Sequence, residues 1–320
     1  MRALLLDKGL RIVDDHPVPE PAPGEALIRV RVAGICNTDL ELVKGYMAFR
    51  GVPGHEFVGV VARAPGAEDW EGRRVVGEIN AACTTCPTCL AGRPTHCPHR
   101  TTLGIAGRDG AFAERLTLPA RNLHPVPDSI PDEIAVFTEP LAAACEILEQ
   151  VHVRPTDCVV VLGDGKLGLL CAQVLALTGC DLTVIGRHED KLDILARRGI
   201  PTALDDGDDS TGSADIVIEA TGHPDGFAAA RRLVRPRGTL VLKSTYHGSF
   251  DADLTMAVVD EITLIGSRCG PFAPALRLLE RGSVAVIQLI QARYPLSQAP
   301  AAFERAARPG TLKVLIDVEP

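Results

Sequence analysis

The densest group of side chains that could bind a metal is a run of four cysteines. Cys83, Cys86, Cys89 and Cys97 have the spacing C-x2-C-x2-C-x7-C. Four thiolates this close in sequence can surround one tetrahedral Zn²⁺ and leave no coordination position for a substrate. Thiols without a metal are one alternative. An iron–sulfur cluster is another, but ferredoxin-type runs have a different fourth interval and a partner cluster motif. We therefore expect a structural zinc site, which would stiffen a loop with few apolar residues of its own.

A second possible metal site is spread over segments that lie far apart in the chain. Cys36, His55 and Glu139 offer one thiol, one imidazole and one carboxylate. Taken singly, such a cysteine is more often a small buried hydrophobe, and such a histidine is more often a hydrogen-bonded polar residue. Taken together, the three are the mixed ligand set of a catalytic zinc that keeps a fourth position open.

A glycine-rich turn in the second half of the chain could bind a dinucleotide. Residues 163–168 have the pattern G-x-G-x-x-G, after a strand-like apolar run at 159–162 and before a helical pattern at 166–178. In that context, small residues admit a pyrophosphate to the N-terminus of the helix. The residues that we expect to contact the cofactor in this turn are Gly163, Gly165, Lys166, Leu167 and Gly168.

The residues after the next strand-like run bear on the choice between NAD and NADP. In dinucleotide-binding folds an acid about 20 residues after the glycines binds the adenosine ribose, and Arg187 stands at that position here. A guanidinium can pair with a 2′-phosphate and stack on adenine. With His188 beside it, Arg187 therefore favours NADP, and NAD remains an alternative because Glu189 or Asp190 could contact the ribose.

Two further polar segments follow strand-like runs and could line the cofactor cleft. Residues 219–222 read Glu-Ala-Thr-Gly, and residues 243–245 read Lys-Ser-Thr. Ligands of open parallel sheets bind outside the carboxyl ends of the strands. We therefore expect Thr221, Lys243 and Thr245 near the cofactor, with a surface ion pair as the alternative for Lys243.

The elements that must position these residues divide the chain in two, because 320 residues are too many for one core. Up to about residue 145, short apolar runs such as 27–32 and 57–61 are separated by Pro and Gly, which is typical of a compact β domain. Beyond that point, strand and helix patterns alternate, which predicts a parallel sheet with helices on both faces. We expect a catalytic unit at 1–145, completed by 270–320, and a dinucleotide-binding unit at 146–269. The expected strands are 159–162, 182–185, 215–218, 239–242, 262–265 and 313–318, and the expected helices are 166–178, 190–198 and 225–234.

Charge, hydropathy and cysteine usage narrow the class of protein. The 33 Lys and Arg against 41 Asp and Glu give a net charge of −8, which argues against nucleic acid or an anionic membrane as a partner. The apolar runs are shorter than the roughly 20 residues of a membrane span, and the first residues become charged too early for a secretory signal. We therefore expect a cytoplasmic protein. Its ten cysteines exceed what packing needs in a reducing compartment.

These motifs resemble the zinc-dependent medium-chain alcohol dehydrogenases over essentially the whole chain. The matching segments are residues 34–39, 54–59, 83–97, 110–114, 139–141, 163–168 and 312–315. The resemblance implies a Rossmann domain with a doubly wound parallel sheet and a GroES-like, β-rich catalytic domain. It also implies two zinc ions per chain, one catalytic and one structural, and assembly into a homodimer or homotetramer.

The resemblance assigns roles to the scattered ligands. Cys36, His55 and Glu139 would bind the catalytic zinc, and a Glu at 139 is similar to the polyol and sugar dehydrogenase branch. Glu56 would lie behind the ligands or exchange with Glu139. Thr38 would accept the proton of the substrate alcohol. Glu41 stands where many relatives continue the proton relay with His, and its alternative is a solvated loop carboxylate.

The expected activity is the oxidation of a secondary alcohol to a ketone, with hydride transfer to NAD(P). The substrate would be a small molecule of the polyol, sugar or aminocyclitol type, and L-threonine-type or simple-alcohol dehydrogenation is the alternative within the class. The same fold could also serve a non-catalytic nucleotide-binding protein or a zinc-free alkene or quinone reductase. Both of these functions are disfavoured by the joint presence of Cys36, Thr38, His55 and Glu139.

Overall fold

Both ends of the chain belong to the same structural unit. The computed structural model describes residues 1–205, 212–245, 249 and 252–319. Contacts within the chain define a first unit of Met1–Glu139 with Leu276–Pro320, and a second unit of Pro140–Ala275. Helix α4 (Thr138–Gln150) leads from the first unit into the second, and α9 (Phe272–Glu280) leads back.

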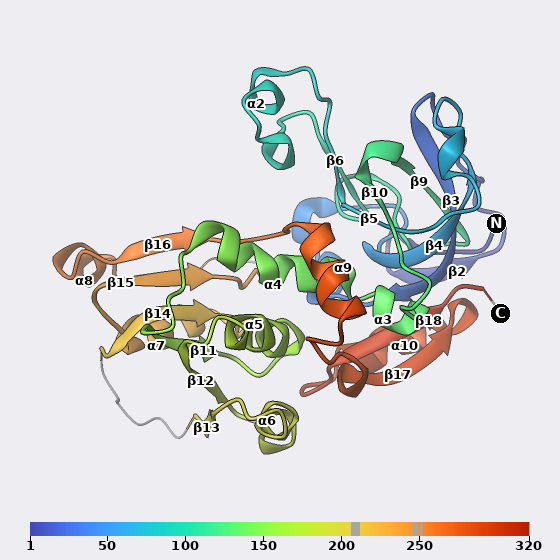
Figure 1. Cartoon of the computed structure of the whole chain (residues 1–320). Helices are drawn as coiled ribbons and strands as arrows, with labels where there is room; N and C mark the ends of the chain where they lie inside the picture. Colours follow the sequence, from blue (N-terminus) through green and yellow to red (C-terminus); the bar gives the residue numbers. More distant parts are fainter. Residues whose placement is uncertain (206–211, 246–248, 250–251, 320) are drawn as a thin grey trace. The chain divides into compact units, whose positions relative to one another are not determined.

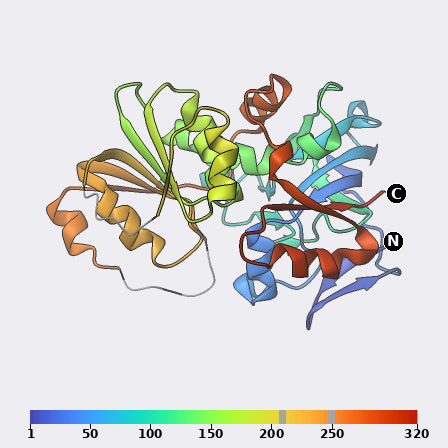
Figure 2. The same ribbon diagram turned by 90° about the horizontal axis from the view of Figure 1, so that it is seen from below.

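The first unit is built on a seven-stranded sheet that joins early and late parts of the sequence. Six strands follow the order β10-β5-β4-β3-β18-β17, and β9 also pairs with β3. Figures 1 and 2 show the C-terminal strands, coloured red, beside the N-terminal strands, coloured blue. The strands are β3 (Glu25–Gly34), β4 (Glu56–Arg63), β5 (Arg74–Gly77), β9 (Arg115–Pro119), β10 (Leu123–Pro125), β17 (Ile290–Pro295) and β18 (Lys313–Asp317).

Shorter elements complete this unit. A hairpin is formed by β1 (Ala3–Leu6) and β2 (Leu10–Val13), and a small sheet by β6 (Asn80–Ala81), β7 (Thr101–Leu103) and β8 (Gly107–Arg108). The α-helices are α1 (Asn37–Val43), α2 (Pro87–Leu90), α3 (Asp132–Ala135) and α10 (Ala299–Ala306). Short 3-10 helices lie at Tyr46–Ala48, Glu68–Trp70, Pro94–His96, Ala120–Asn122, Ile287–Leu289 and Leu296–Gln298.

The second unit is a six-stranded parallel sheet with the order β13-β12-β11-β14-β15-β16. From β11 the chain moves outward to β12 and β13, and then outward on the other side through β14 to β16 (Figure 1). Right-handed crossovers in opposite directions place helices on opposite faces, so the predicted doubly wound sheet is confirmed. The elements are β11 (Cys158–Leu162), α5 (Lys166–Ala176), β12 (Asp181–Gly186), α6 (Glu189–Ala196), β13 (Thr202–Leu204), β14 (Ala214–Glu219), α7 (Gly226–Leu233), β15 (Val234–Leu242), α8 (Thr255–Val259) and β16 (Thr263–Gly266).

The expected elements differ from this sheet most clearly at one junction. The helix expected at 225–234 ends at Leu233, and β15 begins at once at Val234, well before the expected 239. The early start arises because Val234 pairs with Ala214 of β14, while a register shift follows between Ala214 and Ile216. The core of this region is apolar and includes Val160, Val217, Phe227 and Leu240.

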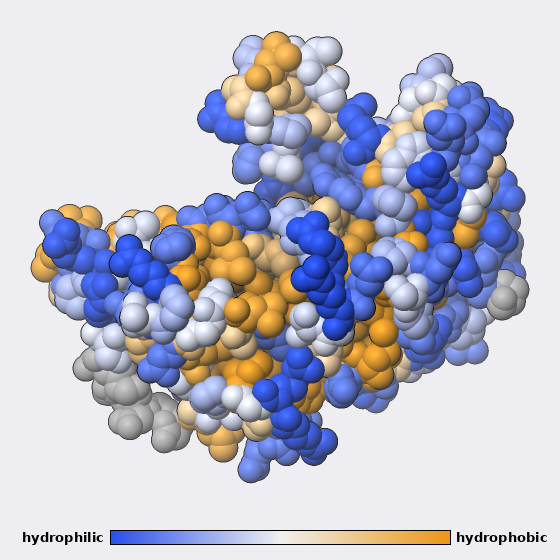
Figure 3. All heavy atoms as spheres, in the orientation of Figure 1, coloured by the Kyte–Doolittle hydropathy of each residue, from blue (hydrophilic) through white to orange (hydrophobic). Residues whose placement is uncertain are grey.

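The far edge of the parallel sheet carries exposed apolar side chains. Strand β16 is the last strand in the order, and its residues are mostly exposed. Val258 in α8 is 76% exposed and Val259 is 65% exposed. Figure 3 shows apolar atoms on the surface at α8. In the part of the chain that the structure describes, no helix is both long and apolar enough to cross a membrane.

Candidate active site

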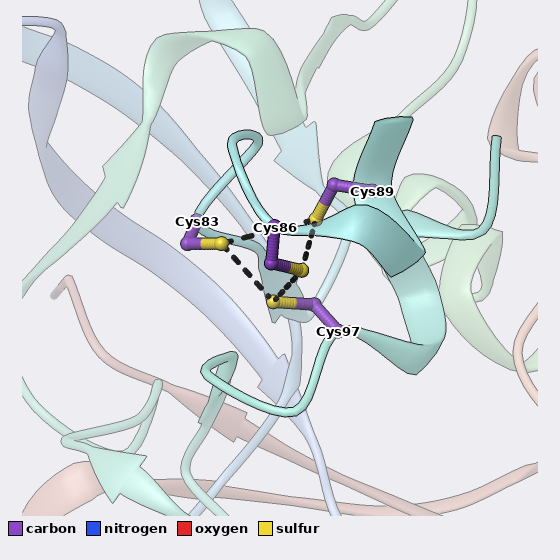
Figure 4. Close-up of side chains that lie close together, drawn as sticks. All are labelled: Cys83, Cys86, Cys89 and Cys97. Carbon is purple, nitrogen blue, oxygen red and sulfur yellow. Dashed lines mark hydrogen bonds between the residues drawn. The ribbon is translucent and has the colours of Figure 1, made fainter. Parts of the chain in front are cut away.

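The four cysteines of the 83–97 run converge on one point (Figure 4). Four of the distances between their Sγ atoms range from 3.5 to 4.0 Å. They are 3.5 Å for the pair Cys86–Cys89, 3.5 Å for Cys83–Cys97, 3.7 Å for Cys86–Cys97 and 4.0 Å for Cys83–Cys89. A zinc–sulfur bond of about 2.3 Å in a tetrahedron requires sulfur atoms about 3.8 Å apart. A disulfide would need about 2.05 Å. The donor set therefore fits one zinc ion.

Local structure of the loop holds these thiols in place. Cys86 precedes the short helix α2, and the Pro at position 87 occupies its first turn. Backbone amides of Thr85 and Cys86 lower the pKa of the Cys83 thiol to about 5. The amide of His99 also donates to Cys97 Sγ over 3.3 Å. Donors aimed at sulfur favour thiolates, which are the form that binds zinc.

The second donor group lies at the end of the large sheet of the first unit. Donor atoms of Cys36, His55 and Glu56 lie within 4.8 Å of one another. The antiparallel pairing of β3 and β4 sets Gly34 opposite Glu56, and Cys36 and His55 flank this pair in sequence. A Cβ at Gly34 would lie 2.3 Å from Oε2 of Glu56, so only glycine leaves room for that carboxylate.

Asp39 orients the first two members of this group. Its carboxylate accepts a 2.8 Å hydrogen bond from the amide of Cys36, which caps α1. Its other oxygen lies 3.2 Å from Nδ1 of His55, and both side chains are buried. The contact is an ion pair and not a hydrogen bond, because within the described residues Nδ1 of His55 and Oδ1 of Asp39 are buried without a hydrogen-bond partner. A carboxylate beside a histidine is the usual second partner of a histidine that binds a metal.

The acidic and thiol groups around His55 favour the presence of a positive charge. Burial alone would lower the pKa of His55, but Asp39 and Cys36 outweigh it and raise the pKa well above its usual range. Among the residues that the structure describes, Oε1 of Glu56 is buried without a hydrogen-bond partner. A divalent cation would satisfy these donor atoms and remove the need for a protonated imidazole. The residues present therefore fit a zinc ion.

Lys313 is a member of this site that sequence reasoning did not assign. It stands at the start of β18, and its Nζ forms a fully buried ion pair with Oε2 of Glu56. Burial alone would lower the pKa of Lys313, but the Glu56 carboxylate outweighs it and raises the pKa. The ammonium also lies 5.6 Å from the centre of the Phe137 ring. The sequence signal was one charged residue inside the apolar run 312–316.

Glu139, the expected third ligand, lies outside the group of donor atoms within 4.8 Å of one another. Burial raises the pKa of Glu139 to about 7, and the charges of His55 and Lys313 oppose this effect. Glu139 is therefore within electrostatic reach of the same centre. The structure brings Cys36 and His55 together with Glu56, the alternative carboxylate, while the role of Glu139 stays a prediction.

The residues expected to handle the proton lie on α1. Oγ of Thr38 lies 3.8 Å from Sγ of Cys36. Glu41 is 7% exposed, and its carboxylate lies 2.8 Å from Nζ of Lys44. The alternative that Glu41 is a solvated loop carboxylate is wrong, because Glu41 lies in α1 and is buried.

In the second unit, the glycine-rich turn has the form that a pyrophosphate requires. A Cβ at Gly163 would lie 2.6 Å from the carbonyl oxygen of Ala220, and a Cβ at Gly168 would lie 2.0 Å from that of Gly163. Gly165 precedes α5, and within the described part of the chain no atom lies near a Cβ built at Gly165 and no side chain caps the helix. The amides at the start of α5, from Lys166 onward, can therefore bind an anion.

The remaining residues expected at the cofactor lie at the carboxyl ends of the same parallel strands. Arg187 directly follows β12, its side chain is 73% exposed, and its Nε donates to Asp205 over 3.1 Å. Thr221 donates to Glu219 over 2.6 Å, and Thr245 is exposed after β15. These placements leave the predicted roles of Arg187, Thr221 and Thr245 open to test.

Lys243 is anchored inside the second unit. Its Nζ donates to the carbonyl oxygen of Ala143 over 2.6 Å and to Ser267 over 3.0 Å. The residue is only 6% exposed, so the alternative of a surface ion pair is wrong. The hydrogen bond to Ala143 joins the end of β15 to α4, and a contact with the cofactor stays a prediction.

Comparisons with known proteins agree with this arrangement. Residues 22–128 match the alcohol dehydrogenase GroES-like domain, and residues 132–318 match the glucose dehydrogenase C-terminus. The chain is 31% identical to an erythritol/L-threitol dehydrogenase of Mycolicibacterium smegmatis, with 89% of this chain and 88% of that protein covered. It is 30% identical to a D-altritol 5-dehydrogenase of Agrobacterium fabrum, with 98% of each covered.

A solved structure of a related protein has the same fold as this chain. A protein of Sinorhizobium meliloti 1021, described as a zinc-binding dehydrogenase and bound to NADP, superimposes with a TM-score of 0.87 at 28% identity, covering 99% of both chains. The thiol cluster, the Cys–His–carboxylate group and the dinucleotide turn thus occur together in a chain that matches two successive domain models. The chain belongs to the zinc-type medium-chain alcohol dehydrogenases, in their polyol dehydrogenase-like branch, and is an NAD(P)-dependent alcohol dehydrogenase.

Proposed function

We propose that this chain oxidises a secondary alcohol of a polyol, sugar or aminocyclitol-like substrate to a ketone, with NADP⁺ as the preferred hydride acceptor. The observation that carries the proposal is the group of half-buried Cys36 with buried His55 and Glu56, a donor set suited to an open zinc site. The relatives named for erythritol, L-threitol and D-altritol support a polyhydroxylated substrate.

Each residue of the site has a separate task in this reaction. Zinc, when bound, supplies a Lewis acid that lowers the pKa of the substrate hydroxyl, and the nicotinamide supplies the hydride acceptor. Thr38 accepts the hydroxyl proton at Oγ and releases its own proton outward. Asp39 fixes the ring of His55, and Lys313 holds Glu56 in place. Glu139 is the third protein ligand in this proposal, and Glu56 is its alternative.

A second zinc ion in the thiol cluster would have a structural role. All four positions of the tetrahedron are taken by Cys83, Cys86, Cys89 and Cys97, so a substrate has no access to the metal. The proposed stoichiometry is two zinc ions per chain. Because thiolates at such sites must stay reduced, we place the protein in the cytoplasm, which is consistent with ten cysteines that form no disulfide within the described residues.

We also propose a homodimer or homotetramer in which a second copy covers the edge of the parallel sheet. Strand β16 has an unpaired edge within the described chain, and Val258 and Val259 are exposed beside it. Exposed apolar strand edges are normally covered. Light scattering should give a particle mass two or four times that of the chain, and a monomer at micromolar concentration would contradict this.

The preference for NADP rests on Arg187, whose terminal guanidinium nitrogens can pair with a 2′-phosphate. Arg187→Ala is expected to weaken NADP⁺ binding about 10- to 100-fold, because it removes one or two charge-assisted hydrogen bonds to the 2′-phosphate. The same substitution should change NAD⁺ binding less than about threefold. Fluorescence titration of both cofactors measures this. Arg197→Ala, which removes a similarly exposed arginine just after α6, is the matched control. Parallel loss of both affinities in Arg187→Ala would contradict the assignment.

The substrate class is tested by following cofactor reduction at 340 nm with NADP⁺ and NAD⁺. The panel should contain four- to six-carbon polyols, sugars, aminocyclitols, L-threonine and simple secondary alcohols. We expect kcat/KM for at least one polyhydroxylated compound to exceed that for every monoalcohol. Turnover of monoalcohols or L-threonine alone would overturn the polyol assignment and favour the alternative within the class.

A further inference from the structure

Asp164, the second residue of the glycine-rich turn, binds the start of the segment that follows β12. One carboxylate oxygen, Oδ2, accepts hydrogen bonds from the amides of Arg187, over 2.6 Å, and His188, over 2.7 Å. Nδ1 of His188 lies 2.9 Å from the same oxygen. Nζ of Lys191, a lysine only 5% exposed, lies 3.5 Å from Oδ1. Asp164 is thus a buried acid surrounded by donors from one neighbouring segment.

This carboxylate fills the space that a side chain at the end of β12 would occupy. A Cβ at Gly186, the last residue of β12, would lie 2.6 Å from Cβ of Asp164 and 2.7 Å from its Oδ2. In dinucleotide-binding folds, an acid near the end of this second strand hydrogen-bonds the 2′-hydroxyl of the adenosine ribose. Here, glycine and arginine stand at positions 186 and 187, and the acid comes from the turn instead.

We propose that Asp164 supplies the carboxylate that the end of β12 lacks, and that it limits the preference of Arg187 for a 2′-phosphate, so that both NADP and NAD bind. This inference rests on the proposed function, in which the glycine-rich turn binds a dinucleotide. Asp164 is then a specificity-determining residue of the cofactor site and acts in opposition to Arg187. Together, Asp164 and Arg187 determine the ratio of the affinity for NADP to the affinity for NAD.

The charges around the turn support this role. Burial alone would raise the pKa of Asp164, but the hydrogen bonds from His188 and the charge of Lys191 outweigh it and lower the pKa. The carboxylate is therefore ionised at neutral pH. The guanidinium of Arg187 is in turn shared with Asp205. A 2′-phosphate bound beside Arg187 would thus face the carboxylates of Asp164 and Asp205 as well as the cations Arg187 and Lys191, whereas a 2′-hydroxyl would face no repulsion.

The test measures binding of two cofactor fragments to the full, zinc-loaded chain without turnover. Isothermal titration with 2′,5′-ADP and 5′-AMP gives the ratio of their affinities. Asp164→Asn keeps an oxygen that can accept from the amides of Arg187 and His188, and removes the charge. We expect the ratio to shift about tenfold toward 2′,5′-ADP, which is the effect of removing one charge a few ångströms from a phosphate.

Matched variants separate a charge effect from a structural one. Asp193→Asn removes an exposed acid of α6 and should leave the ratio unchanged. Asp164→Ser removes the same charge with a smaller side chain and must shift the ratio in the same direction, which keeps the test valid if Asp164→Asn fails to fold. The Asp164 variants could instead lose affinity for 2′,5′-ADP and 5′-AMP in parallel, with the ratio of the two affinities within twofold of wild type. In that case Asp164 only stabilises the local structure, and the inference is overturned.

The outcomes also distinguish this inference from the proposed function. A wild-type chain that binds neither fragment would overturn the cofactor site itself, and this inference with it. A wild-type chain that binds 5′-AMP more tightly than 2′,5′-ADP would overturn the preference for NADP. In that case, a tenfold shift in Asp164→Asn would still support the role of Asp164, and an unchanged ratio would contradict it.

Discussion

Cys36→Ser is expected to lower kcat/KM by about a thousandfold while the chain stays folded. A serine hydroxyl is a poor zinc ligand at neutral pH, so the open metal site would lose its thiolate, and with it about 4 kcal/mol of transition-state stabilisation. The thiol cluster at 83–97 does not include Cys36 and should keep its metal. Zinc content should therefore fall from two ions per chain to one, with turnover followed at 340 nm.

A second cysteine variant controls for the loss of a thiol as such. Cys180 is partly exposed just before β12, and its Sγ lies 3.7 Å from the carbonyl oxygen of Leu175, far in sequence from both donor groups. Cys180→Ser should therefore keep both metals and full activity. Thermal unfolding of the Cys36→Ser protein should stay close to that of wild type. Turnover within tenfold of wild type, at one zinc per chain, would refute the role of Cys36.

Lys313→Met is expected to destabilise the protein by about 3–5 kcal/mol, the usual cost of leaving one member of a buried ion pair without its partner. Lys313 and Glu56 are 2% and 1% exposed, so solvent cannot replace the lost charge. Methionine has a similar length and fills most of the volume of the lysine stem. Urea unfolding of the zinc-loaded chain measures the change in the free energy of unfolding.

Substituting Glu56 as well distinguishes the cost of an unpaired buried charge from the cost of lost packing at Lys313. In the double variant Lys313→Met with Glu56→Gln, no charge is left unpaired, so most of the stability should return. Arg293→Met serves as the surface control, because its ion pair with Asp317 is partly exposed and should contribute less than about 1 kcal/mol. A loss in Lys313→Met no larger than that in Arg293→Met would contradict the proposed role of the pair.

The features that could be predicted from the sequence are those encoded locally. Cys83 to Cys97 span a single short loop, and the pattern of residues 163–168 occupies one strand–turn–helix junction. The alternation of apolar strands and amphipathic helices likewise predicted the parallel sheet, because each element carries its own periodicity. The junction at Val234 differed, because pairing with β14 extended a strand beyond its apolar run.

The features that could not be predicted depend on contacts between distant residues. Lys313 meets Glu56 across 257 positions, through the pairing of a C-terminal strand with the N-terminal sheet. Asp164 lies beside Gly186 because β11 and β12 are neighbours, and the missing side chain at 186 is visible only in three dimensions. Whether Glu56 or Glu139 lies beside Cys36 and His55 also depends on the register of the strands, which residue types alone do not specify.

The most direct test of the two-metal account is the metal content of the purified, unmodified chain. Inductively coupled plasma mass spectrometry should find two zinc ions per chain, one for the thiol cluster and one for the group around Cys36 and His55. Mild chelation should remove one ion first, together with the activity at 340 nm. One zinc ion per chain in a fully active protein, or none, would contradict the assignment of the catalytic site.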